Sequence, residues 1–88
     1  MSKSRAYQKI KELLPICIMH IEKIRHFQRL MHDEKDRVVC EKLMTHYFKH
    51  TQELDELLTK SFLNPATIKT LLKRAEDIIS EEERKRGI

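Results

Sequence analysis

Residues 38–63 carry apolar side chains at intervals of three and four positions, and no glycine or proline interrupts them. This spacing predicts one apolar face on a long helix. The whole chain contains one glycine and two prolines, so it has little of the material from which turns are built. We therefore expect a chain that is helical nearly throughout, without strands.

Three helices are expected. Pro15 removes a backbone donor inside the first one, but the apolar stripe continues on both sides of it, which favours a kink over a break. Asp33 is expected to cap the second helix, and Asn64 and Pro65 form a typical start for the third. The helices are predicted to span about residues 4–32, 34–60 and 65–86 of one domain, 1–88.

The connection near residue 33 is short, which predicts that the first two helices pack antiparallel. The third helix has an apolar stripe of its own and is expected to pack on this pair. The predicted fold is all-α, a three-helix bundle built on an antiparallel helical hairpin. The apolar faces are broad for 88 residues, so a homodimer that forms a larger bundle is an alternative.

Composition excludes several classes of protein. No apolar run reaches the roughly 20 residues that a membrane-spanning helix needs, and the N-terminus does not resemble a signal peptide. We therefore expect a cytoplasmic protein in which Cys17 and Cys40, both on apolar faces, are free thiols. The net charge is +4, and the bases of the N-terminal third scatter around the polar side of their helix. A chain of this length cannot enclose a deep active site, so self-contained catalysis is not expected.

One local motif stands out in the second helix. The segment Thr51-Gln52-Glu53-Leu54-Asp55 sets a threonine and an aspartate one turn apart on an otherwise apolar arc. Met44 and Phe48 belong to the same arc. A carboxylate at the rim of an apolar surface is suited to contact with another protein. The alternative without a binding function is a threonine whose hydroxyl hydrogen-bonds to the backbone carbonyl one turn back, and an aspartate at the edge of the core.

Residues 21–58 resemble the small sporulation-regulating aspartyl-phosphate phosphatases of endospore-forming bacteria, which are helical hairpins with a Ser-Gln-Glu-Leu-Asp motif. Ile21, Glu22 and Arg25 fit the opening of that family's first helix. The chain departs from the family by Thr51 in place of serine, by longer helices, by a turn without glycine, and by the third helix from Pro65 onward.

The resemblance implies a function in regulation. Asp55 would enter the active site of a phosphorylated response regulator and promote loss of its phosphoryl group, with Gln52 beside it. Thr51, Phe48 and Met44 would contact the partner. The chain would then be at most a phosphatase that acts on a partner's aspartyl phosphate, and no cofactor is expected.

Histidines offer an alternative function. His46 and His50 are four positions apart, and Cys17 and His20 are three apart, so each pair shares a helix face. If the hairpin turns near residue 33, position 20 lies level with position 46. Cys17, His20, His46 and His50 would then converge as a tetrahedral metal site.

A third candidate is nucleic acid. The helix after Asn64 and Pro65 carries Lys69, Lys73 and Arg74, which resembles the recognition helix of a helix-turn-helix protein. Phe62 stands where such turns usually place glycine, which argues against this reading. A purely structural helical protein, acting in interaction or oligomerisation, remains a further alternative.

Overall fold

The computed structural model describes residues 2–87, which form three helices and no strand. Helix α1 spans Ser2–Asp33, α2 spans Arg37–Lys60 and α3 spans Pro65–Lys85. The prediction of an all-α chain with three helices is confirmed. Helix α1 continues through Pro15 and is the longest of the three, with 32 residues. None of the helices in the described range is apolar and long enough to cross a bilayer.

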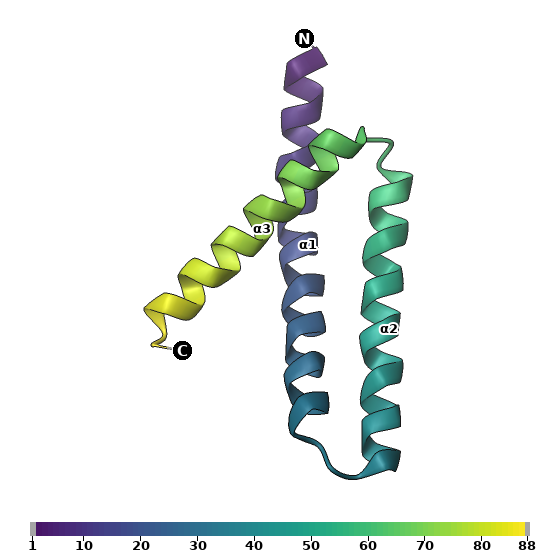
Figure 1. Ribbon diagram of the computed structural model, residues 1–88. Helices are drawn as coiled ribbons and strands as arrows, with labels where there is room; N and C mark the ends of the chain where they lie inside the picture. The colour runs from purple at the N-terminus through teal and green to yellow at the C-terminus, as the bar shows by residue number, and fades with distance from the viewer. Residues whose placement is uncertain (1, 88) are drawn as a thin grey trace.

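The chain reverses between α1 and α2, and α2 then runs back beside α1 (Figure 1). Asp36 caps α2, since its Oδ1 accepts hydrogen bonds from the backbone N–H groups of Val38 (2.9 Å) and Val39 (3.4 Å). The expectation that Asp33 is this cap is therefore wrong. Asp33 is the last residue of α1, so its helical backbone cannot take the extended conformation of an N-cap, which Asp36 adopts.

The start of α3 follows the sequence signal. The side chain of Asn64 accepts a hydrogen bond of 2.9 Å from the backbone N–H of Thr67, and Pro65 is the first helical residue. Proline costs nothing there, because the N–H that it lacks would have had no intrahelical partner. Ahead of this cap, Ser61 is buried and its hydroxyl donates to the carbonyl of Leu58. Phe62 then turns the chain with a positive φ of 59°.

The core lies where all three helices meet. Helix α3 crosses α1 diagonally and moves away from α2 toward its C-terminal end (Figure 1). The buried apolar residues are Cys17 and Ile21 from α1, Leu58 from α2, and Leu71, Ala75 and Ile79 from α3. Because α3 packs mainly on α1, the predicted three-helix bundle is not confirmed.

In the half of the hairpin near its turn, α3 reaches only α1, where Glu83 approaches Arg25 and Arg29. Several large apolar side chains there are exposed: Leu30 (40%), Val38 (61%), Met44 (43%) and Phe48 (57%). Surface apolar residues occurring singly need no explanation, but a group on one end of a small domain does.

Candidate functional site

The motif of α2 lies on the solvent side of the helix. Met44, Phe48, Thr51, Gln52 and Asp55 are all exposed, and at about 100° per residue they fall within an arc of about 100°. We call these five residues the outer stripe. Its apolar members stand on the turns before its polar ones. The structure therefore brings together every residue that the resemblance assigns to partner contact.

Asp55 sits at the α3-proximal end of the outer stripe. Within residues 2–87 its carboxylate accepts no hydrogen bond and forms no ion pair. Thr51 is different, because its hydroxyl donates a hydrogen bond of 2.9 Å to the carbonyl of Tyr47 one turn back. This is the local bond expected of a threonine inside a helix. The aspartate thus remains available to another molecule, whereas the threonine hydroxyl is already engaged.

Three potential metal ligands converge on the opposite side of α2, at its interface with α1. The Nδ1 atoms of His20 and His50 lie 3.2 Å apart, and Oε2 of Glu53 lies 3.9 Å from Nδ1 of His20. His20 is only 6% exposed, whereas His50 and Glu53 are half-buried. One ligand atom from each residue lies within 4.8 Å of the others.

Two residues of the expected metal set lie elsewhere. The ring of His46 stacks on Phe27, with centroids 5.3 Å apart, and is exposed. Cys17 is fully buried in the apolar core, and that burial raises the pKa of its thiol. Of the four residues in the expected set, the structure thus brings only His20 and His50 together.

Charge neighbours shape the chemistry of His50. Burial lowers its pKa, the Glu53 carboxylate opposes that effect, and the positive charges of His20, Lys49 and Lys23 lower the pKa further. The neutral imidazole, which is the form that binds metals, is therefore favoured at neutral pH.

The bases of α3 are exposed, as a nucleic-acid interface would require, but they do not form a continuous stripe. Lys69 and Lys73 share one face of α3, and Arg74 lies about 100° further round. The exposed acids Glu76 and Asp77 follow on the face of the two lysines. A phosphate backbone would meet alternating charges there, which weakens its attraction.

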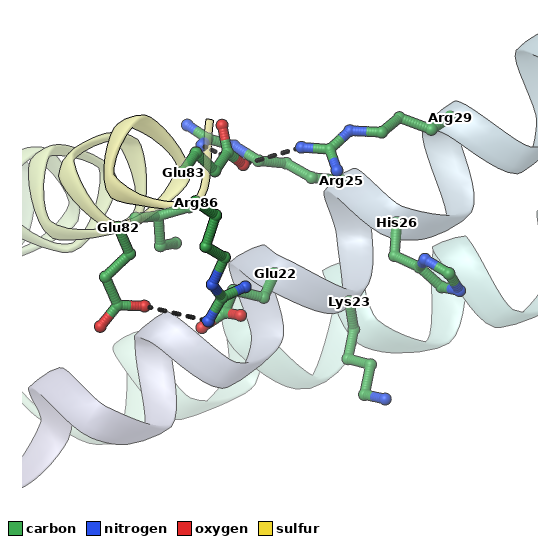
Figure 2. A pocket seen from close by; sticks show the side chains of 9 residues that line it. Glu22, Lys23, Arg25, His26, Arg29, Glu82, Glu83 and Arg86 are labelled. Atoms are coloured by element: carbon green, nitrogen blue, oxygen red, sulfur yellow. Dashed lines mark hydrogen bonds and ion pairs between the residues drawn. The ribbon is translucent and has the colours of Figure 1, made fainter. Parts of the chain in front are cut away.

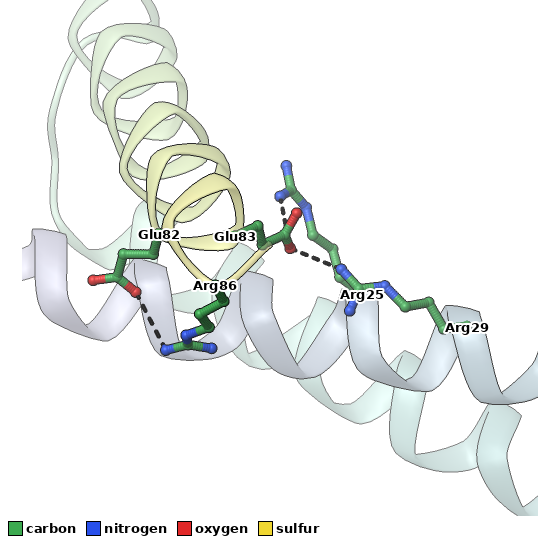
Figure 3. Close-up of polar contacts among 5 residues, drawn as sticks. All are labelled: Arg25, Arg29, Glu82, Glu83 and Arg86. Carbon is green, nitrogen blue, oxygen red and sulfur yellow. Dashed lines mark hydrogen bonds and ion pairs between the residues drawn. The ribbon is translucent and has the colours of Figure 1, made fainter. Parts of the chain in front are cut away.

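A cleft of about 310 Å³ lies between α1 and the end of α3, and Figure 2 shows the charged side chains that line it. Oε1 of Glu83 lies 2.7 Å from Nη2 of Arg29 and 3.9 Å from Nη1 of Arg25. Glu82 pairs with Arg86 on the same helix at 3.8 Å (Figure 3). Since these acids and bases pair with one another, the cluster fits a clamp between two helices better than a ligand site.

Sequence reasoning missed Glu53 as a neighbour of His20 and His50, and Glu83 as the partner of two arginines. Glu53 carried a usable signal, because it follows His50 by three positions and so shares its helix face. Glu83 carried none, since it is one of three consecutive glutamates and only the path of α3 selects it.

Comparison of the chain with protein-family models, with curated proteins and with solved structures finds no match. The likeness of residues 21–58 to the sporulation-regulating phosphatases therefore depends on the residues quoted above and on nothing further.

Proposed function

We propose that this chain is a regulatory protein-interaction module whose outer stripe docks onto a partner protein and delivers Asp55 to it. The observation that carries the proposal is the exposure of Asp55, which has no polar partner within residues 2–87. The partner we propose is a phosphorylated response regulator, which would place the activity in the cytoplasm.

The helix behind the stripe supports this use. Leu54 and Leu57 are half-buried and Leu58 is buried against the core, so α2 is held firmly where it carries Asp55. Because the helix backbone is already ordered, it loses little conformational entropy on binding, which keeps the entropic cost of docking low. Met44 and Phe48 add apolar surface that a partner can bury.

The resemblance to the aspartyl-phosphate phosphatases names the chemistry. In the proposed reaction a water oxygen bonds to phosphorus, the bond from phosphorus to the partner's aspartate oxygen breaks, and inorganic phosphate leaves. The partner supplies the phosphoryl group and its own metal-bearing pocket. Asp55 and Gln52 would enter that pocket beside the water, so the catalytic site is complete only in the complex.

The test uses receiver domains of response regulators, phosphorylated with acetyl phosphate, and measures phosphate release with and without this chain. We expect the wild-type protein to accelerate release from a cognate receiver at least tenfold, and Asp55→Ala to abolish the acceleration. The matched control is Glu56→Ala, which removes the same charge from the next, also exposed, position of α2. That variant should retain the activity, because position 56 points about 100° away.

The proposal fails if no receiver domain is affected by the wild-type chain, or if Asp55→Ala and Glu56→Ala behave alike. Salt-dependent binding to duplex DNA that falls on replacing Lys69 and Lys73 would support the nucleic-acid alternative instead. A homodimer that uses the outer stripe would hide Asp55, and sedimentation velocity at micromolar concentration distinguishes that case.

A further inference from the structure

The contact between His20 and His50 has the dimensions of a metal site. Two ligands bound to one zinc ion at about 2.0–2.1 Å and at a tetrahedral angle lie about 3.4 Å apart. The two Nδ1 atoms are 3.2 Å apart, so their separation matches that of two ligands on one ion. His20 is buried and held by α1, and His50 reaches it from α2.

Glu53 supplies the third donor. It lies one turn after His50 on α2, and its Oε2 is 3.9 Å from Nδ1 of His20. Its side chain is 43% exposed, so it is free to move toward an ion, and its donor oxygen already lies within 4.8 Å of a donor atom of each histidine. Its negative charge also offsets Lys23 and Lys49, the bases whose charges act on His50.

We propose that His20, His50 and Glu53 form a binding site for a divalent transition-metal ion, with zinc as the best match. Two imidazole nitrogens and one carboxylate oxygen are a ligand set that zinc accepts, and a fourth position remains for water or an added ligand. The site is distinct from the outer stripe and does not depend on the proposed function.

The competing explanation is a hydrogen bond between the two rings without any metal. In that state one Nδ1 carries the proton and the other accepts it. Zinc needs the Nδ1 lone pairs of both rings, so on binding the ring that carries its proton on Nδ1 shifts that proton to its own Nε2, and no net proton is released.

The experiment is a titration of the chelator-stripped full chain with zinc chloride by isothermal calorimetry. We expect one zinc per chain, with affinity reduced at least tenfold by His50→Ala and by Glu53→Gln. Both residues are half-buried, so neither substitution should prevent folding, which circular dichroism verifies. The control is His46→Ala, which removes an exposed imidazole one turn away and should leave the affinity unchanged.

The visible absorption spectrum of the cobalt(II)-bound protein tests the identity of the ligands independently. The proposed set gives the visible bands of a four-coordinate nitrogen and oxygen site without a thiolate charge-transfer band. Three results would overturn the proposal: no binding by the wild-type chain, full affinity in Glu53→Gln, or a thiolate band that implicates Cys17. An equal loss of affinity in His46→Ala would likewise assign the ion to a different set of histidines.

Discussion

Glu83 of α3 forms an ion pair with Arg29 of α1, with 2.7 Å between Oε1 and Nη2, across 54 positions of sequence. Arg25 approaches the same oxygen at 3.9 Å. The pair is partly exposed, with 28% of the glutamate side chain and 56% of the arginine side chain accessible. It ties the end of α3 to α1 beyond Ile79, the last buried apolar residue of α3.

Glu83→Gln should lower the free energy of unfolding by less than about 1 kcal/mol, because exposed ion pairs contribute that little. The loss should be smaller at high salt, which screens charges at the surface. The matched control is Glu82→Gln, since within residues 2–87 the ion pair of Glu82 is with Arg86, the C-cap residue of α3 itself. Urea unfolding at low and high salt measures both variants. Equal effects would mean that the clamp contributes nothing to the docking of α3.

The two cysteines should differ in reactivity. Cys17 is fully buried and its pKa is raised by that burial, whereas Cys40 is half-buried. Thiolate is the nucleophile, so iodoacetamide should modify Cys40 first and Cys17 only in urea. Mass spectrometry of the digested protein reports both sites. Comparable rates at the two positions in the folded chain would contradict the packing of Cys17.

The same thiol makes stability depend on alkaline pH. The folded pKa of Cys17 lies above its unfolded value of 9.0, so the stability gained from the neutral thiol is complete below about pH 9. It is lost as the pH rises through the folded pKa. The wild-type chain should therefore lose more stability between about pH 8.5 and 10 than Cys17→Ala, in which this group is absent.

Phe62 adopts a backbone conformation that side chains disfavour, with φ at 59°, and its side chain is 92% exposed. Glycine avoids the clash of Cβ with the backbone in this region, which costs other residues about 1 kcal/mol or more. Phe62→Gly should therefore raise the free energy of unfolding by about 0.5 kcal/mol, part of the gain being offset by the freer unfolded chain. Phe62→Ala removes the same ring but keeps Cβ, and should bring no such gain. If the two variants unfold at the same urea concentration, the turn is not strained.

Local chemistry made part of the fold predictable. Asn64 and Pro65 identify the start of α3 because both act locally: the Asn64 side chain accepts from a backbone N–H three positions later, and Pro65, which lacks an N–H, follows directly. The cap of α2 was missed since Asp33, Glu34 and Asp36 stand within four positions, and each has a side chain able to accept backbone hydrogen bonds there. Which of them caps the helix depends on where α1 ends, and that is decided by packing over many residues.

The pairing of histidines shows the same limit. A hairpin that turns near residue 33 sets His20 level with His46, whereas the observed turn at residues 34–36 brings it to His50. Two residues of error in the turn shift the partner by one helical turn, because each residue counts on both helices. The exposure of Asp55 was predictable, since it follows from its place on the helix relative to Leu54, Leu57 and Leu58.

The core lies at the end of the α1–α2 hairpin away from its turn. It divides the hairpin into a firm half, packed against α3, and a loose half near the turn. Amide hydrogens near Cys17 and Leu58 should be protected by packing from three helices, whereas those near the turn at 34–36 should exchange through local opening. The outer stripe crosses this boundary, with Met44 in the loose half and Asp55 beside the firm one. A docking protein would therefore meet apolar side chains that adjust to its contours, while the carboxylate keeps a fixed position.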